Sequence, residues 1–504
     1  MAKSSHELLA ESLERVQASA FRGLIVASSD LSSTDRSRLV EAGWLTEITR
    51  GYYLLNQPSG EKDQLTMVYV QGYWPFLELY LSKTEKAPYC LNPQASLDLH
   101  TGHETPPKQL IILSQGTSTR QLVLPDERRV LIYPDAKRFP AETVLQRGLR
   151  VMTLPITLAR LKPADFLPER DKIVTALRMV HVQDLAQALL VERNMEAASR
   201  LIGAYDQMGW TKEAAEIRDT LGAAGFKAKA QEPFPSPPAR IPYTRVVSPY
   251  AERIRVMWRG MRGAVEAEFA GFTGDPAVSE TDYLRRVDEG YVNDAYHSLS
   301  IEGYQVTPDL IARIRDGKWN PDNPEDQKQI DAMAAKGYLE AFKSVKESIR
   351  ALFAGKPAGV VLQEDLGRWY RALFSPSVDA GLLAPSDLAG FRRRTVIIRG
   401  SMHTPPSNEA VPDGMEAFFA AAHEEENPAV RAVLGHFIFT FIHPYVDGNG
   451  RLGRFIMNAM FASARMPWTI IRTETRGAYM AALEEASVRG DIAPFARFVR
   501  RNIG

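Results

Sequence analysis

Apolar positions recur at spacings of three and four residues through most of the second half of the chain, which predicts helices there. The predicted helical stretches are 251–272, 280–302, 308–316, 326–353 and 359–374. One segment departs from this pattern, because Thr395 to Ile398 indicates a short strand that enters a turn at Gly400. Residues 251–504 therefore predict an all-α domain with one short β-hairpin.

The first half mixes short helices with alternating strand patterns. Helical spacing early in residues 7–56 gives way, from Gly43 to Leu55, to an apolar alternation broken by a glycine turn. Helices followed by a hairpin are typical of a winged helix-turn-helix, which we place at residues 1–60.

Residues 61–225 predict a small α/β module that ends in helices. Strand-like runs occur at 109–114, 120–125, 129–134 and 149–154, and helical spacing returns over 170–225. Residues 226–250 contain six prolines, which exclude regular helix and predict an extended interdomain linker. With 504 residues, such a multidomain organisation is expected.

Composition narrows the class of protein. The chain has 45% hydrophobic and 24% charged residues, contains no apolar run long enough to span a membrane and begins without the pattern of a signal peptide, so we expect a cytoplasmic protein. Cys90 is the one cysteine, which excludes a disulfide framework or a thiolate cluster. Lys plus Arg and Asp plus Glu are equal at 61 each, so no overall field favours nucleic acid or anionic lipid.

The candidate chemistry lies in a loop between two predicted helices. A helix from Pro428 to Ile442, with Asn427 as its N-cap, ends at a loop whose Pro444 and glycines prevent its continuation. The next helix begins near Arg451, and its N-terminus would attract an anion, since free N–H groups and the helix dipole favour negative charge. The sequence therefore predicts a phosphate-binding loop.

The side chains of this loop suit phosphoryl chemistry. His443 can accept a proton from a hydroxyl at neutral pH, and Asp447 supplies the single carboxylate expected of a phosphate-bound Mg²⁺. Arg451 and Arg454 offer guanidinium groups to phosphate oxygens, and Asn449 can donate a hydrogen bond to developing charge.

Residues 443–454 resemble the catalytic motif of the Fic family, H-P-F-x-(D/E)-G-N-(G/K)-R-x-x-R, with Tyr445 in place of Phe. The resemblance implies transfer of AMP from ATP to a protein hydroxyl by an all-α Fic fold. It assigns the base to His443, the Mg²⁺ ligand to Asp447, the α-phosphate site to Gly448, Asn449 and Gly450, and the other phosphate contacts to Arg451 and, for the γ-phosphate, Arg454. Tyr445 adds a hydroxyl that needs a polar partner or solvent.

Two further segments are similar to parts of that family. Residues 395–412 resemble its flap, a hairpin that pairs with the main chain of the target, and Val396, Ile397 and Ile398 would form it. Ser298 to Gly303 resembles the inhibitory helix motif (S/T)-x-x-x-E-(G/N), within a helix near 290–303. The resemblance implies that Glu302 pairs with Arg454, and it also places Tyr479 and Leu483 near the adenine.

Alternatives remain open at several positions. His436 lies two helical turns before His443, but without a third nitrogen or sulfur ligand we favour a packing role over a metal site. The same site could instead remove AMP from a modified protein, if Glu302 orients water. A third hypothesis is a nucleotide-sensing DNA-binding regulator with little turnover.

The N-terminal half resembles abortive-infection antitoxin-like proteins, in which a winged helix precedes an α/β domain, on phrases such as Arg50-Gly51-Tyr52-Tyr53. Residues 1–56 carry Lys or Arg at positions 3, 15, 22, 36, 38 and 50 and Asp or Glu at 7, 11, 14, 30, 35, 41 and 47. This balance lacks the basic surface that DNA binding needs. The expected partner is therefore a protein bearing a hydroxyl side chain, with self-modification and a homodimer left open and no membrane contact.

Overall fold

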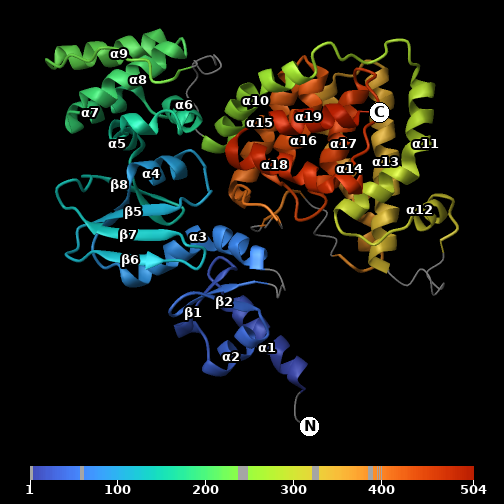
Figure 1. Ribbon diagram of the computed structural model, residues 1–504, viewed down its shortest axis with the longest axis horizontal. Helices are drawn as coiled ribbons and strands as arrows, with labels where there is room; N and C mark the ends of the chain where they lie inside the picture. Colours follow the sequence, from blue (N-terminus) through green and yellow to red (C-terminus); the bar gives the residue numbers. More distant parts are fainter. Residues whose placement is uncertain are drawn as a thin grey trace. The chain divides into compact units, whose positions relative to one another are not determined.

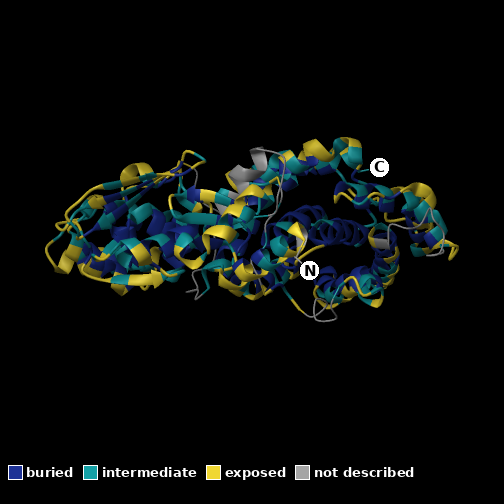
Figure 2. Ribbon diagram, turned by 90° about the horizontal axis from the view of Figure 1, so that it is seen from below, coloured by how far each residue is buried: buried dark blue, intermediate teal, exposed yellow. Residues whose placement is uncertain are grey.

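The computed structural model describes residues 4–56, 62–235, 248–319, 329–383, 390–393, 396, 398 and 400–503. The chain divides into two compact units (Figure 1). Unit 1 comprises Met1–Pro249 and Ile397–Thr404, and unit 2 comprises Tyr250–Val396 and Pro405–Gly504. Within each unit the buried residues lie on the inside of the ribbon and the exposed ones on its outer turns (Figure 2).

Unit 1 begins with two helices and a three-stranded antiparallel sheet of order β1-β3-β2. These elements are α1 (Ser5–Ser19), β1 (Ile25–Ala27), α2 (Ser33–Glu41), β2 (Leu45–Thr49) and β3 (Tyr52–Leu55). Helices followed by a hairpin match the sequence pattern, and the hairpin turn contains Gly51 with a φ of 87°. Glycine adopts this left-handed conformation without a Cβ penalty.

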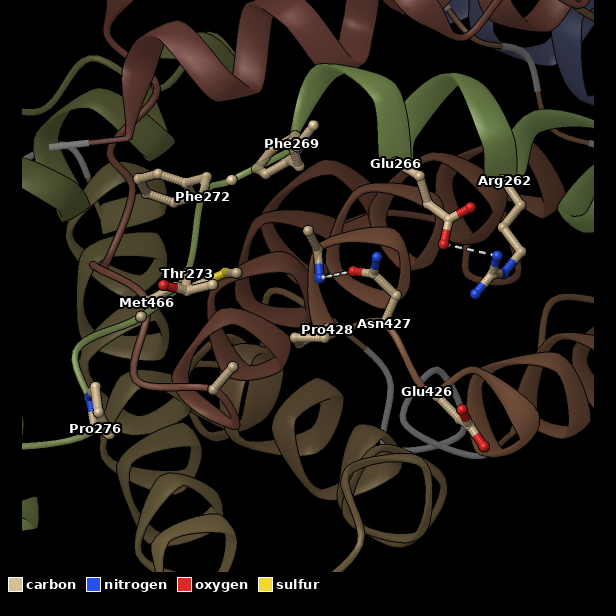
Figure 3. A pocket seen from close by; sticks show the side chains of 15 residues that line it. Arg262, Glu266, Phe269, Phe272, Thr273, Pro276, Glu426, Asn427, Pro428 and Met466 are labelled. Atoms are coloured by element: carbon tan, nitrogen blue, oxygen red, sulfur yellow. Dashed lines mark hydrogen bonds and ion pairs between the residues drawn. The ribbon is translucent and has the colours of Figure 1, made fainter.

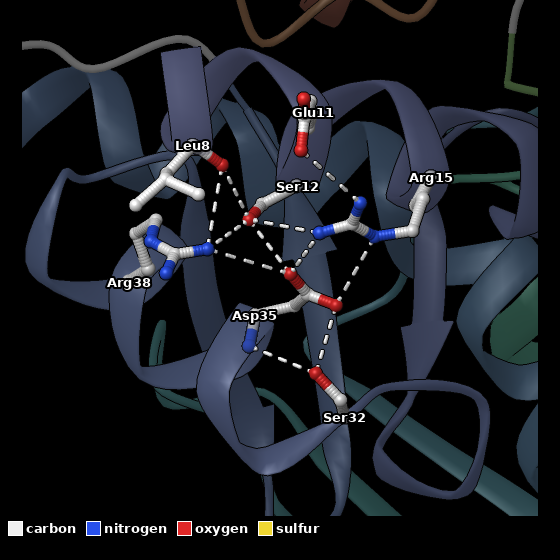
Figure 4. Close-up of polar contacts among 7 residues, drawn as sticks. All are labelled: Leu8, Glu11, Ser12, Arg15, Ser32, Asp35 and Arg38. Atoms are coloured by element: carbon white, nitrogen blue, oxygen red, sulfur yellow. Dashed lines mark hydrogen bonds and ion pairs between the residues drawn. The ribbon is translucent and has the colours of Figure 1, made fainter. Parts of the chain in front are cut away.

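A polar cluster joins α1 to α2 (Figure 4). Asp35 Oδ1 accepts hydrogen bonds from Arg15 Nη2 at 2.6 Å and from Ser12 Oγ at 2.7 Å, and Arg38 Nη1 donates to Ser12 Oγ at 2.6 Å. The bond from Arg15, followed by those from the two serines around it, holds the pKa of Asp35 well below its usual value. Arg15 and Arg38 are therefore engaged inside this subdomain.

The rest of unit 1 is an α/β module. Its strands and the helices among them are α3 (Lys62–Thr84), β4 (Tyr89–Leu91), α4 (Pro93–His100), β5 (Gln109–Ser114), β6 (Arg120–Val123), β7 (Arg129–Pro134), β8 (Thr143–Gln146) and β9 (Leu149–Met152). The larger sheet has the order β4-β5-β7-β6, with β5 and β7 parallel, and β8 pairs with β9. Five helices follow: α5 (Leu154–Ala159), α6 (Arg170–Met179), α7 (Val182–Glu192), α8 (Met195–Gln207) and α9 (Thr211–Ala223).

Part of the predicted linker packs against unit 1. Gln231 N donates to Ser199 O at 2.9 Å, and Phe234 is buried. Gly203 permits this approach, because a Cβ there would lie 2.0 Å from Gln231 O. Residues 226–235 are therefore bound chain and not free linker, and residues 236–247 lie outside the described part.

Unit 2 is helical in its described residues. Its helices are α10 (Pro249–Glu268), α11 (Glu280–Ile301), α12 (Pro308–Arg315), α13 (Gln329–Phe353), α14 (Ala358–Asp379), α15 (Val411–Glu424), α16 (Pro428–Ile442), α17 (Asn449–Ala462), α18 (Arg476–Arg489) and α19 (Ala493–Asn502). The central α16 is apolar on nearly all sides, and twelve of its residues are buried. As predicted, Asn427 caps it, since its Oδ1 accepts from Ala429 N and Val430 N.

The strand predicted at 395–398 falls partly on residues outside the described part of the chain. Val396 and Ile398 lie outside any strand, and Thr395 and Ile397 are not among the described residues. From 400 to 410 the chain has a turn at Gly400, residues without regular structure and the 3-10 helix Asn408–Ala410, so these residues contain no strand.

Candidate active site

The predicted phosphate-binding loop joins α16 to α17. His443 ends α16 with a φ of 52°, and Gly448 precedes α17 with a φ of 84°. The Asn449 side chain holds the loop closed, because its Oδ1 accepts from Tyr445 N at 3.0 Å and its Nδ2 donates to Tyr445 O at 2.9 Å. In this state both ends of that amide are used within the loop, whereas the sequence predicted a bond to phosphate.

Tyr445 replaces the expected phenylalanine without disturbing the packing. Its ring stacks on Tyr370 with centroids 3.8 Å apart and an interplanar angle of 8°, and Phe391 lies at 5.7 Å. Burial raises the pKa of the Tyr445 phenol. The aromatic ring therefore fills the core position that phenylalanine would occupy.

His443 is held as a neutral imidazole. Its Nδ1 lies 3.2 Å from Thr440 O, and because a carbonyl can only accept, Nδ1 carries the proton and Nε2 keeps its lone pair. Burial lowers the pKa of His443 to about 4; the Thr440 bond opposes this shift and the nearby Arg392 guanidinium adds to it. At neutral pH the ring can thus accept a proton at Nε2.

The structure brings Ser298, Glu302 and Arg454 together from opposite ends of unit 2. Arg454 Nη2 donates to Glu302 Oε1 at 2.8 Å and to Ser298 O at 3.0 Å, and Arg454 Nε donates to Ser298 Oγ at 2.9 Å. Glu302 ends α11, and Gly303 follows with a φ of 93°. One guanidinium nitrogen, Nη2, contacts one carboxylate oxygen, so the pair is not bidentate; Ser298 accepts from Nε and shares Nη2 with Glu302.

Glu302 also fills the space beside the loop. A Cβ built on Gly450 would lie 2.2 Å from Glu302 Oε1 and 3.3 Å from Arg454 Nη1. This nitrogen is buried and has no hydrogen-bond partner in the part of the chain that the structure describes. The carboxylate therefore occupies the N-terminal end of α17, where the sequence predicted phosphate.

Asp447 accepts hydrogen bonds from three groups. Its Oδ2 accepts from Arg451 Nη2 at 3.1 Å and from Tyr304 Oη at 3.2 Å, while its Oδ1 accepts from Gly448 N at 2.6 Å. Arg451 is buried between the rings of Tyr304 and Phe374, 5.0 and 5.1 Å from their centroids. Sequence reasoning missed Tyr304, although it directly follows the Glu302-Gly303 pair.

The predicted magnesium ligand suits such an ion. The Asp447 side chain is 56% exposed, so one carboxylate faces solvent at the mouth of the loop. Among the described residues no group of three His, Cys, Asp or Glu side chains could hold a metal by itself. Mg²⁺ is commonly bound through one or two carboxylates, with waters and substrate phosphates completing its shell, and the donor set here fits that chemistry.

His436 has the packing role that the sequence favoured. It is fully buried, its Nε2 lies 2.8 Å from Tyr479 Oη, and burial lowers its pKa to about 3. Tyr479 itself is buried, so in this state its ring belongs to the core around Arg454.

Three cavities among the described residues of unit 2 bear on the site, and the smallest, of about 220 Å³, lies beside Tyr370, Phe391 and Tyr445. The largest one, of about 720 Å³, is at the opposite end of α16 from His443 and is lined by residues such as Arg262, Asn427 and Phe272 (Figure 3). The Arg262 guanidinium in this cavity forms ion pairs with Glu425 and Glu266, and Asn427 caps α16. These polar groups therefore stabilise the fold and are not free to bind a ligand. A second cavity, of about 310 Å³, adjoins the loop, since Tyr304, Asp447 and Arg451 are among its lining residues.

Residues 361–461, which span α16, the loop and most of α17, match the Fic/DOC family. The chain contains a Fic domain. Its mostly helical fold and its loop are those the sequence predicted for the second half.

Two curated relatives of the Fic domain are named protein adenylyltransferase Fic. The one from Nematostella vectensis is 30% identical over 221 residues, which cover 43% of this chain and 48% of that protein. The one from Aedes aegypti is 29% identical over 229 residues, or 44% and 42%. The chain thus spans less than half the length of these relatives.

A solved structure of a Fic-1 fragment from C. elegans is 18% identical, covers 69% of this chain and 93% of its own, and has a TM-score of 0.38. Within the described residues, no helix is both long and apolar enough to cross a lipid bilayer.

Proposed function

We propose that the Fic domain transfers AMP from ATP to a Ser, Thr or Tyr hydroxyl of a protein. The observation that supports this most directly is the neutral His443, with Nε2 free as an acceptor, beside the glycine-flanked N-terminus of α17. The name of the curated relatives, protein adenylyltransferase, supports the same reaction. The target protein's hydroxyl is the nucleophile and ATP is the AMP donor.

The residues of this chain divide the reaction between them. The target oxygen forms a bond to the α-phosphorus, its proton passes to His443 Nε2, and the bond from the α-phosphorus to the bridging oxygen breaks to release pyrophosphate. The N–H groups at the start of α17 would hold the α-phosphate, and Arg454 the γ-phosphate. Magnesium on Asp447 would neutralise charge on the phosphates and leaving group.

We further propose that the structure is an inhibited state. Glu302 takes a donor of Arg454 and places a negative charge where the γ-phosphate would bind. ATP could still enter, but with its α-phosphate out of line with the attacking oxygen, which lowers the rate more than the affinity. The self-modification and homodimer left open by the sequence are outcomes to look for in the same assays.

The experiment that tests the function uses the Glu302→Gly protein with lysate and ATP labelled at either the α- or the γ-phosphate. AMP transfer deposits the α label on protein and releases the γ label in pyrophosphate. Label arriving on protein only from the γ-phosphate would instead mean phosphorylation and would contradict the proposal.

A second candidate is removal of AMP from a modified protein. Glu302 Oε1 binds Arg454, and its Oε2 has no hydrogen-bond partner among the described residues, so this oxygen could orient a water molecule. Incubation with a pre-modified protein separates the two reactions, because removal releases free AMP without ATP.

The N-terminal part of unit 1, which we propose to be a winged helix, provides little for the DNA-binding hypothesis. Two of its six basic residues, Arg15 and Arg38, are bound within the Asp35 cluster. We therefore propose that it binds protein or packs on the chain itself. A gel shift with promoter DNA at two salt concentrations is the check, since a phosphate-bound complex weakens steeply with salt.

Asp447→Ala is expected to abolish the Mg²⁺ dependence of transfer together with the activity. Asp447 carries the only carboxylate between His443 and Arg454, so no second one in the loop can replace this ligand. Calorimetric titration of Mn²⁺ or Mg²⁺ in the presence of ATP measures the loss, and Asp379→Ala, an exposed carboxylate at the end of α14, is the control. Unchanged metal affinity in Asp447→Ala would move the ligand elsewhere.

Gly450→Ala is expected to raise the rate of transfer severalfold above wild type. The added methyl would lie 2.2 Å from Glu302 Oε1, so the carboxylate has to leave Arg454. Gly263→Ala is the matched control, because a Cβ at that helical glycine meets nothing within 4 Å. In a Glu302→Gly background the substitution should bring no further increase; a fall there would show that the methyl blocks phosphate.

A further inference from the structure

Arg392 has a buried guanidinium and contacts the backbone of the loop between α16 and α17. Its backbone N donates to Pro444 O at 2.9 Å, and its Nε donates to His443 O at 2.8 Å. Its Nη2 donates to Pro406 O. The side chain is 4% exposed, so these bonds form away from water, where losing an acceptor's partner is costly.

The bonds meet the loop at its strained residue. His443 has a φ of 52° and a ψ of 57°, a left-handed conformation that is unfavourable for a residue with a Cβ. Such a conformation persists only where the surroundings hold it. Arg392 donates to the carbonyls of both His443 and Pro444, which fixes the peptide planes on the C-terminal side of that residue.

The same guanidinium joins two points that are distant in sequence. Arg392 precedes and Pro406 follows residues 393–405, and the bond from Nη2 to Pro406 O ties the two ends of this segment together at His443. A planar fork with donors on different nitrogens can serve two carbonyls at once, whereas a lysine ammonium is a point charge on a flexible stem.

We propose that Arg392 is a positioning residue for the transfer reaction, which holds the left-handed backbone of His443 and thereby aims its imidazole at the attacking hydroxyl. It touches neither nucleotide nor target in this role. The proposal rests on the proposed function, because the proton acceptor it positions is the base of that reaction.

The electrostatics of the site agree with this geometry. After burial, the groups that act on His443 are the Thr440 carbonyl and the carboxylates of Glu302 and Asp447, which favour its protonated form, and Arg392, which disfavours it. Removing the Arg392 charge therefore raises the pKa of His443. The acid limb of the rate profile, where the base becomes protonated, then moves to higher pH.

The test compares three substitutions in the full-length Glu302→Gly protein. Arg392→Gln removes both the positive charge and the planar guanidinium donors, whereas Arg392→Lys keeps only the charge. Arg393→Gln changes the exposed neighbour and is the control. We measure kcat and KM for Mg-ATP against pH, ATP affinity by calorimetry, and the titration of the histidine ring by NMR in ¹⁵N-histidine-labelled protein.

Arg392→Gln should lower kcat about 10- to 100-fold, since a misplacement of about 1 Å can cost 10²-fold, and should shift the acid limb upward. ATP affinity should stay within twofold or so, because Arg451, Arg454 and the loop amides are unchanged. Arg392→Lys should keep the acid limb and still lose kcat, which separates position from charge.

Other results overturn the proposal. If Arg392→Lys restores kcat, the charge alone matters and the positioning role is wrong. If both variants lose ATP affinity in step with kcat, Arg392 only stabilises the fold. If neither variant differs from Arg393→Gln, Arg392 has no role in the reaction. Absence of transfer in the parent protein would refute the proposed function, while the NMR shift of the His443 ring in Arg392→Gln would still report the contact.

Discussion

His443→Ala should reduce AMP transfer about 10²- to 10⁴-fold and leave ATP binding nearly unchanged. The imidazole is needed only when the target hydroxyl loses its proton, whereas the nucleotide is held by the start of α17 and by arginines. Single-turnover transfer measures the first quantity and calorimetry with Mg-ATP the second. Both are best made in the Glu302→Gly background, where the wild-type base is active.

The same assay carries a pH test. Because the pKa of His443 is lowered to about 4, the rate should stay level from pH 7 down to about 5 and fall only below that, instead of falling near 6.5. His423→Ala, an exposed histidine of α15, is the control and should match the parent. Transfer by His443→Ala at the parental rate would remove this residue from the mechanism.

Glu302→Gly should raise target modification and self-modification about 10- to 100-fold over wild type. The lost pair is a charge-assisted hydrogen bond with the carboxylate about a quarter exposed, and such bonds are worth about 1.5–3 kcal/mol. Arg454→Ala should not activate, since it removes the γ-phosphate contact, and the double variant should behave like Arg454→Ala alone. Labelled ATP with lysate reports all three.

Melting temperatures test the pair of Glu302 and Arg454 independently of the transfer rate. Arg454 is buried, so Glu302→Gly leaves a cation with Ser298 as its main partner and should lower the melting temperature. Mg-ATP should then raise the melting temperature of Glu302→Gly more than that of wild type, because the γ-phosphate replaces the lost carboxylate. Equal rates and equal melting shifts in the two proteins would contradict the autoinhibition proposal.

Local patterns in the sequence predicted what local chemistry controls. The Asn427 cap, the apolar α16 and the break at Pro444 follow from residue types a few positions apart. The loop residues could be found because eight specified positions stand within twelve. The strands at 109–114 and 129–134 were equally visible, since the buried alternation of a sheet is written along one segment.

Contacts between distant segments were not predictable in this way. Tyr304 and Arg392 reach the loop from 143 and 51 residues away, and neither belongs to a pattern of its own. Strands β4 and β8 are short, and β4 depends on its pairing with β5. Phe234 is buried although it lies in the proline-rich segment 226–250 that the sequence predicted to be a linker, because tertiary contacts override local composition.

The turn around Gly303 has a thermodynamic consequence. Glu302 before it binds Arg454 and Tyr304 after it binds Asp447, so one short piece of backbone occupies both the residue proposed for the γ-phosphate and the proposed metal ligand. When either ligand displaces the turn, the other ligand no longer has to spend binding free energy on displacing it. By linkage, metal ion and nucleotide should each tighten the other's binding by the same factor, even before they share a direct bond.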